Sequence, residues 1–450
     1  MEFLLFFIMF IICIISIIAS GYQLTHPAVL FSGVWCVSSL GCCFSTGIMH
    51  EKLEATTLIF LILLNLVFVV TTLFCSSNVS KKNQKYDYSN GQPPKVKVSK
   101  YFVIFFLFFY MLASFYLYKD LLRMASTIGD IKSFSDIFRL ARYADTMEIT
   151  SYSFLSTYIL RFNIAIGIVS IYYASKYFFL KQKKPSRTFL LFFLISMIFT
   201  FFSAARNQAI MLISSALFTS LYNFYYYSPK RNRTLFKKAL GAMILSGVVF
   251  ILIFIFMGVF LLDRMKDGSL EGVIYSLIEY ISGPILAFNY FIKNVGEYTS
   301  PYFGAYSFTT LNNLLTHLGI LENPISAIAP FMSNGYLSVN VYTLYFRYMV
   351  DFGVFGTFFL TMIDGILYGL LFRICLTHKD KSKVIPIVSL LIYGVIMSFF
   401  EEKIFTFLNG YLTIIVMIVI VKYVFDKVSL KNKKKKYFIG YSNIIMQSKD

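Results

Sequence analysis

Residues 340–374 read NVYTLYFRYMVDFGVFGTFFLTMIDGILYGLLFRI, and the rest of the chain is best understood outward from this stretch. Its first half carries Arg347 and Asp351, where a long polar segment runs into the apolar residues 354–374. That apolar run is long enough to cross a bilayer as one helix. A charged pair at such a boundary is costly unless it is paired or in use, so we treat it as a candidate functional site.

Runs of the same kind recur along the whole chain. The 450 residues are 58% hydrophobic and only 14% charged, which is more apolar surface than one soluble core could bury. The runs fall at about 3–20, 28–49, 56–76, 101–118, 152–175, 188–205, 207–227, 239–262, 354–374, 384–400 and 404–424. We therefore predict an all-α polytopic integral membrane protein with about 11 transmembrane helices, forming a single membrane domain over residues 1–450.

Basic clusters between the runs predict the orientation. Lysine and arginine concentrate in five segments that an even number of crossings separates from one another: 81–100, 176–187, 230–238, 378–383 and the basic tail at 425–450. Positive segments stay in the cytoplasm, so we expect the N-terminus outside and the C-terminus inside. This distribution also explains the net charge of +19 as membrane topology, with no nucleic-acid partner.

Two segments then face outward. Segment 119–150 is charge-balanced, and its part 135–144 has a serine N-cap and apolar residues at helical spacing, which predicts a short helix on the outer membrane surface. Segment 263–350 is a large extracytoplasmic loop between the eighth and ninth predicted helices. Its apolar part 273–292 is interrupted by Gly283-Pro284, and we expect one or two helices that rest on or dip into the outer leaflet.

Several catalytic classes lack their sequence signals here. The chain has no P-loop, no dinucleotide-binding glycine fingerprint, no HExxH and no metal-type spacing of cysteine and histidine. It also has no Asp-x-Asp of the kind that holds a divalent ion for a nucleotide-sugar donor. We expect no metal site and no cofactor, and a lipid-linked substrate in place of a cytoplasmic nucleotide donor. The six cysteines imply no disulfide framework.

Arg206 is the second candidate site residue. The runs 188–205 and 207–227 meet at this arginine almost without a loop, on the side that the basic clusters predict to be outside. A guanidinium forms two parallel hydrogen bonds with a phosphate, so Arg206 is a candidate clamp for a lipid pyrophosphate. The alternative is an arginine that marks a helix end and extends its charge to the membrane surface.

Arg347 and Asp351 allow two interpretations. If 345–372 is one helix, a spacing of four places them on one face, where they can form a salt bridge at the membrane edge. Alternatively, Arg347 binds the pyrophosphate while Asp351 orients it or accepts a proton from a sugar hydroxyl. Farther along, the Gly365-x-x-x-Gly369 spacing favours a helix-packing groove over a ligand site.

Three other positions are weaker candidates. Glu401-Glu402-Lys403 lies at the next outer turn, where two adjacent acids on a helix cannot both face inward, and a solvated edge is the favoured interpretation. His317, in the large loop, is either a general base or an ordinary loop histidine. Arg161 lies inside the fifth run and requires a carboxylate or phosphate partner there.

Three stretches, 202–210, 279–290 and 340–343 with 351–356, resemble the Wzy-type oligosaccharide repeat-unit polymerases, which polymerise O-antigen, capsule and exopolysaccharide repeats. The hydropathy likeness covers nearly the whole chain. The resemblance implies a GT-C-like, metal-independent glycosyltransferase in the bacterial cytoplasmic membrane. It would transfer a growing glycan from undecaprenyl pyrophosphate to an incoming lipid-linked repeat unit, with a flippase and a chain-length regulator as possible partners.

The resemblance also implies roles for individual residues. Arg206 and Arg347 would hold the pyrophosphate, and Asp351 or His317 would assist the acceptor hydroxyl. Our candidate substrate-binding residues are Arg161, Tyr280, Gly283, Pro284, Asn340, Tyr342 and Glu401. One family feature, an outer-loop arginine followed eleven positions later by glycine, is missing from this sequence.

Two other functions remain open. A flippase for the lipid-linked repeat would show charges through the middle of several helices and two-fold internal similarity, and we find no internal repeat. An O-antigen ligase would share the outer arginines, so the sequence separates it poorly from a polymerase.

Overall fold

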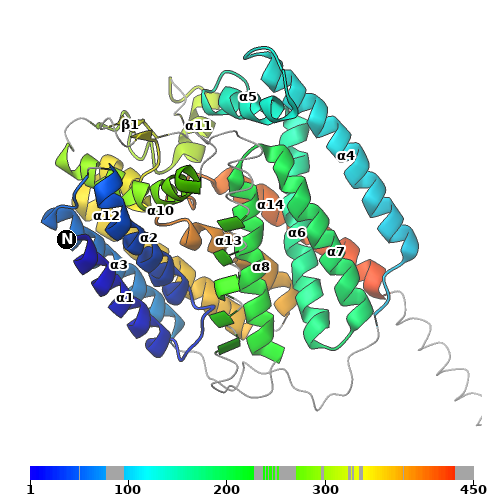
Figure 1. The fold of residues 1–450 in the computed structure, drawn as a ribbon. Coiled ribbons are helices and arrows are strands. Elements are labelled where there is room, and N and C mark those ends of the chain that lie inside the picture. The colour runs from blue at the N-terminus through cyan, green and yellow to red at the C-terminus, as the bar shows by residue number, and fades with distance from the viewer. Residues whose placement is uncertain are drawn as a thin grey trace, which may run out of the picture. The chain divides into compact units, whose positions relative to one another are not determined.

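The computed structural model describes residues 1–49, 51–77, 96–227, 270–294, 298–322, 329–333, 338–378 and 380–430, with residue 326 and scattered residues between 237 and 252. The described chain is helical apart from one short antiparallel pair, β1 (Met332–Ser333) and β2 (Ser338–Val339) (Figure 1). The helices are α1 (Glu2–Ala19), α2 (Pro27–Met49), α3 (Ala55–Ser76), α4 (Lys100–Ser126), α5 (Phe134–Thr146), α6 (Phe154–Phe179), α7 (Lys183–Phe199), η3 (Thr200–Ser203), α8 (Arg206–Tyr227), α10 (Leu270–Lys293), α11 (Thr309–His317), α12 (Leu344–Thr377), α13 (Lys381–Ile396) and α14 (Leu408–Leu430).

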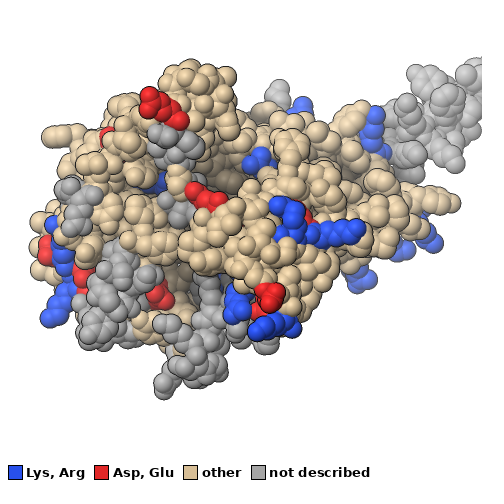
Figure 2. Space-filling view, turned by 90° about the horizontal axis from the view of Figure 1, so that it is seen from above, with Lys and Arg blue, Asp and Glu red and all other residues tan. Residues whose placement is uncertain are grey.

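Within the described residues, eight helical spans are long and apolar enough to cross a membrane: α1, α2, α3, α4, α6, α7 with η3, α12 and α14. Large apolar side chains are exposed on several of them, such as Phe3 and Phe7 of α1 and Phe105 and Phe115 of α4. Outward-facing apolar side chains of this kind suit contact with lipid tails. Figure 2 shows one face on which most atoms belong to neither acidic nor basic residues. The chain is therefore an α-helical polytopic membrane protein, as predicted.

Other predicted runs also form helices, although outside those eight spans. Runs 207–227 and 384–400 correspond to α8 and α13. The run at 239–262 lies largely outside the described residues, as do the basic segments at 81–95 and 231–236 and the tail from 431. The count of eleven crossings stays a prediction.

The chain divides into two compact units. The first comprises residues 1–84, 232–384 and 388–412, and the second comprises residues 85–231, 385–387 and 413–450. In the first unit, α12 packs along α3. A side chain at Gly365 would meet Thr71 Oγ1 at 1.9 Å, and one at Gly369 would meet the Thr72 carbonyl oxygen at 2.8 Å. The predicted packing groove on α12 is confirmed, with α3 as its occupant.

Helix α10 runs through Gly283-Pro284 without a break, so these residues do not divide the apolar stretch into two helices. It lies along α2 in the same direction: Ser38 Oγ donates to the Ile281 carbonyl at 2.7 Å, and Asn289 Nδ2 donates to Glu51 at 2.7 Å. Pro284 has no N–H to donate to the Tyr280 carbonyl four residues earlier, and Ser38 donates to the next carbonyl, that of Ile281. Helix α10 therefore lies alongside a candidate span, and its depth in the membrane stays a prediction.

In the second unit, the predicted short helix of segment 119–150 is α5. Its N-cap is Ser133, two residues before the serine that the sequence suggested, and Asp136 completes a capping box. One face buries Ile137, Phe138 and Ala141. The amphipathic pattern therefore predicted the helix correctly and missed only its first turn.

Contacts between loops agree with the predicted alternation of crossings. The Leu53 amide donates to the Glu2 carboxylate at 2.9 Å, so the start of α1 lies beside the start of α3. At the opposite ends of the neighbouring helices, His26 and Ser76 are hydrogen-bonded at 2.8 Å. Both contacts join segments that the positive-inside pattern places on one side of the membrane. Which side faces outward stays a prediction.

Candidate functional site

A buried ion-pair group forms where α12 begins. Arg347, in the first turn of α12, is 1% exposed. Its guanidinium donates to Glu401 Oε1 at 2.7 Å and to the Tyr306 carbonyl at 3.0 Å. The other oxygen of Glu401 lies 2.5 Å from Lys403 Nζ. One carboxylate therefore bridges two cations, and we call Arg347, Glu401 and Lys403 the Glu401 cluster.

The two cations keep Glu401 ionised. Burial alone would raise the pKa of the Glu401 carboxyl. Lys403 and then Arg347 lower this pKa by more than burial raises it, so the net result is a pKa below the ordinary value. A buried arginine is stable only with such partners, because removing one leaves an unpaired charge in the interior. Glu401 is therefore the anion that Arg347 and Lys403 share.

Glu402 is also buried, at 1% exposure. Its carboxylate accepts from the backbone amides of Ile404 at 2.5 Å and of Phe405 and Thr406 at 2.9 Å. Burial raises the pKa of Glu402, and these donors offset only part of that rise. The sequence interpretation of a solvated edge was wrong here. Residues 401–403 are not helical, so the rule that adjacent acids on a helix point apart does not apply.

Asp351 holds the 300–307 segment. It accepts from Ser300 Oγ at 2.6 Å, from the Tyr306 amide at 3.2 Å and from the Ser307 amide at 2.6 Å. Arg347 binds the carbonyl of the same Tyr306. The spacing of four does place both charges on one face, as predicted, and there both contact the 300–307 segment. The carboxylate partner of Arg347 that the structure shows is Glu401, 54 residues away.

Helix α12 bends directly after this site. Gly353 has φ 64° and ψ −165°, a conformation that only glycine adopts without strain. The α12 residues before it form a short helix at the loop, and those after it form the apolar part. The kink therefore separates the turns that carry Arg347 and Asp351 from the part of α12 that packs on α3.

The other predicted site residues of the first unit are Tyr280, Gly283, Pro284, His317, Asn340 and Tyr342. The Tyr280 ring lies 4.4 Å from that of Phe400, next to Glu401, while Gly283 and Pro284 are buried in α10. Tyr342 is 1% exposed, stacks on Phe346 at 4.0 Å and donates to the Pro330 carbonyl. Asn340 is half-buried at the end of β2, and His317 is exposed at the end of α11.

Arg206 and Arg161 belong to the second unit, so they are described apart from the Glu401 cluster. Arg206 is the first residue of α8 and follows Ala204, whose φ of 46° makes the tight turn that the sequence predicted. Arg161, on α6, donates to Thr413 Oγ1 at 3.1 Å and lies over the Tyr158 ring. The partner of Arg161 that the structure shows is thus a hydroxyl and an aromatic face.

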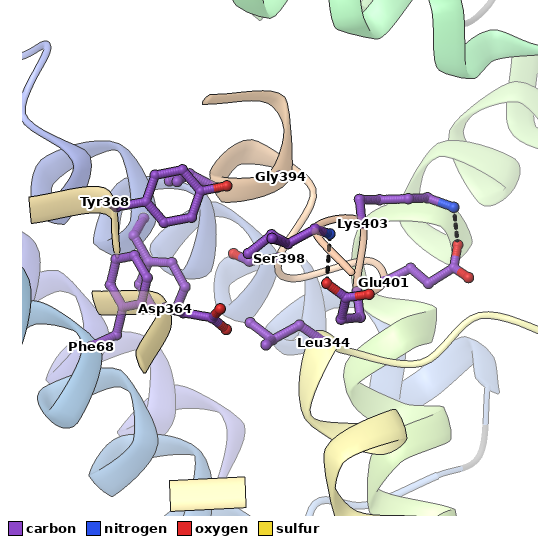
Figure 3. Close-up of a pocket in the computed structure, with 12 residues that line it drawn as sticks. Phe68, Leu344, Asp364, Tyr368, Gly394, Ser398, Glu401 and Lys403 are labelled. Atoms are coloured by element: carbon purple, nitrogen blue, oxygen red, sulfur yellow. Dashed lines mark hydrogen bonds and ion pairs between the residues drawn. The ribbon is translucent and has the colours of Figure 1, made fainter. Parts of the chain in front are cut away.

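A small pocket lies behind the Glu401 cluster, between α12 and the 398–404 loop (Figure 3). Asp364, Ser398 and Glu402 line it with Lys403 and Glu401. Its free volume is about 10 Å³, close to what one water molecule needs. Asp364 was not among the site residues predicted from the sequence, although an aspartate within the apolar run 354–374 is itself a signal of function.

In the part of the chain that the structure describes, no three side chains of histidine, cysteine, aspartate or glutamate are grouped as a metal site. The chain matches no family model, no curated protein and no solved structure. The Glu401 cluster, the contacts of Asp351 with residues 300–307 and the Asp364 pocket are therefore the structural basis for any assignment of function.

Proposed function

We propose that this chain is an oligosaccharide repeat-unit polymerase of the bacterial cytoplasmic membrane, which joins undecaprenyl-pyrophosphate-linked repeat units into a surface polysaccharide. The observation that supports this most is the Glu401 cluster, in which Arg347 and Lys403 share one carboxylate beside the 298–308 segment. Two cations that converge on one anion, in a helical membrane protein, suit the diphosphate of a lipid-linked glycan.

The two cations would act on the leaving group. In the transfer, the bond between the donor's anomeric carbon and the phosphate oxygen breaks, and the acceptor hydroxyl oxygen forms a new bond to that carbon. Undecaprenyl pyrophosphate departs with one more negative charge. Arg347 and Lys403 stabilise that charge once the diphosphate has displaced Glu401 from between them. Lys403 is 17% exposed and Arg347 1%, so the lysine meets the diphosphate first.

The acceptor hydroxyl loses its proton to a base. The Asp351 carboxylate already accepts three hydrogen bonds from the 300–307 segment, so we assign it to positioning that loop. His317, exposed at the end of α11, remains the candidate base. Arg206, at the start of α8, is proposed as a second phosphate-binding arginine.

The test is polysaccharide profiling of a deletion strain complemented with variants at matched membrane levels. Lys403→Gln is the main variant, because Lys403 is partly exposed and its loss leaves Glu401 paired with Arg347. Arg206→Ala tests the second arginine. Arg139→Ala is the control, since Arg139 is an exposed arginine on α5 that pairs with Asp136.

We expect the deletion strain to accumulate single repeat units at the outer face. Wild type and Arg139→Ala restore long chains, whereas Lys403→Gln and Arg206→Ala give few or none. Accumulation of repeats on the cytoplasmic face would identify a flippase. Long lipid-linked chains that never leave the lipid would identify a ligase. If Lys403→Gln and Arg206→Ala both restored chains of wild-type length, the proposed phosphate-binding site would be wrong, and the polymerase assignment would still stand.

A further inference from the structure

Asp364 is a carboxyl group whose surroundings the proposed polymerase step does not explain. It lies on α12, eleven residues after the Gly353 kink, and is 1% exposed. Its Oδ2 accepts from the Tyr348 hydroxyl at 2.8 Å. Its Oδ1 is fully buried and has no hydrogen-bond partner among the described residues. Figure 3 shows this carboxyl group pointing into the pocket toward Leu344 and Ser398.

If Asp364 were ionised, few groups around it could stabilise its negative charge. Phe31 of α2 and Phe68 of α3 form the apolar side of the pocket. Of the described residues that line it, Lys403 alone is a cation, and it is already bound to Glu401. Among the described residues, the other titratable groups around Asp364 are Tyr345, Tyr348 and Tyr368 of α12, Glu401 and Glu402 of the loop, and Tyr411 of α14. A second carboxyl group, Glu402, in the same pocket makes a further negative charge more costly.

We propose that Asp364 is a proton-binding site: it carries a proton at neutral pH and exchanges that proton with water through the pocket. The hydrogen-bond pattern sets which oxygen holds it. Oδ2 accepts from Tyr348 and is the carbonyl oxygen of the acid. Oδ1 is the hydroxyl oxygen, and its proton points into the pocket, where there is room for about one water molecule.

The pocket favours a proton over a metal ion. A bound sodium or potassium ion requires several oxygen ligands, whereas the pocket supplies few that are not already engaged. Ser398 Oγ accepts from Trp35, the Tyr368 hydroxyl donates to the Leu391 carbonyl, and Glu402 accepts three amides. The Lys403 ammonium in the pocket wall also repels a second cation. Protonation removes the charge of Asp364 and requires none of these ligands.

Infrared spectroscopy of the purified full chain in detergent tests the proposal. Wild type, Asp364→Asn and Glu401→Gln are compared at neutral pH, in H₂O and in D₂O. We expect a C=O band of a protonated carboxylic acid that is lost in Asp364→Asn, kept in Glu401→Gln and shifted within minutes in D₂O. If Asp364→Asn does not fold, Tyr348→Phe replaces it. Loss of the tyrosine hydroxyl frees the acid carbonyl and moves the same band to higher frequency.

Two results would overturn the proposal. The first is a difference between the wild-type and Asp364→Asn spectra that consists only of a carboxylate band, which means that Asp364 is ionised in wild type. The second is a sodium-dependent rise in thermal stability that Asp364→Asn abolishes, with no acid band in wild type, which means that the site holds a metal cation. An acid band that D₂O does not shift would contradict exchange through the pocket.

Discussion

Two groups of charged residues lie in segments that the sequence places outside the membrane, and they differ in how they are built. On α5 of the second unit, Arg139 pairs with Asp136 and Arg142 with Asp145, each three residues away, and both arginines are at least 30% exposed. In the Glu401 cluster, Arg347 is 1% exposed and its partner is 54 residues distant. Local exposed pairs add little to stability, whereas a buried, long-range pair fixes how segments pack.

The chain's single tryptophan can report the effect of substitutions in the Glu401 cluster. The chain has one tryptophan, Trp35, which is fully buried, stacks on Tyr345 and donates to Ser398. Tyr345 is two residues before Arg347, and Ser398 is three before Glu401. Tryptophan fluorescence therefore reports on the Glu401 cluster without any label.

The largest effect is expected for Arg347→Met. This change leaves the Tyr306 carbonyl without its donor and the buried Glu401 with one cation, which we expect to cost about 3 kcal/mol. The measurement is thermal unfolding in detergent, followed by Trp35 fluorescence. Arg347→Met/Glu401→Leu should recover part of the loss, because an apolar pair replaces the broken ion pair, although Lys403 then loses its carboxylate partner. Equal destabilisation of the single and double variants would contradict the pairing.

Asp351→Ala should have the next largest effect. It removes the acceptor of three hydrogen bonds and leaves two amides of the 300–307 segment without a partner, a loss of about 2 kcal/mol. Hydrogen exchange of residues 300–307 should rise, while exchange in the α3–α12 contact stays as in wild type. Unchanged protection of 300–307 would mean that Asp351 does not anchor the loop.

Acid should weaken the Glu401 cluster. The pKa of Glu401 is lower in the folded protein than its ordinary value of 4.5. The ionised carboxylate therefore makes its full contribution to the stability of the fold above about pH 4.5. The contribution is lost as pH falls through the lower, folded pKa. The unfolding temperature of wild type should thus fall more steeply below about pH 4.5 than that of Glu401→Gln. Parallel curves for the two proteins would contradict the ionised assignment.

The smallest effect is expected for Arg139→Ala on α5. An exposed pair with a spacing of three contributes about 0.5 kcal/mol or less, and salt screens it. Circular dichroism should show an unfolding temperature close to that of wild type. A loss as large as that of Arg347→Met would remove the contrast between the two regions.

The features that were predicted correctly from the sequence depend on residues that lie close together in the chain. Apolar runs gave the membrane helices, helical spacing gave α5, and the two glycines at 365 and 369 gave the groove that α3 fills. Each of these follows from a pattern within one segment.

The sequence did not predict contacts between distant segments. The burial of Glu401 and Glu402 depends on a non-helical turn and on an arginine 54 residues earlier. The partners of Asp351 lie 44 to 51 residues before it. Pro284 is tolerated within α10, where the Ser38 hydroxyl of α2 donates to a neighbouring carbonyl. Spacing along the chain carries no information about such partners.

The most direct test of the proposed polymerase is its reaction in liposomes with lipid-linked repeat units prepared from the organism that carries this chain. Wild type should form a ladder of longer glycans and release undecaprenyl pyrophosphate. Lys403→Gln should raise the KM for the donor about tenfold or more, as expected from the loss of a charged contact. It should lower the unfolding temperature less than Arg347→Met does, because Lys403 is the more exposed of the two cations and Glu401 keeps its bond to Arg347. No ladder from wild type would contradict the function, and wild-type kinetics from Lys403→Gln would contradict the site.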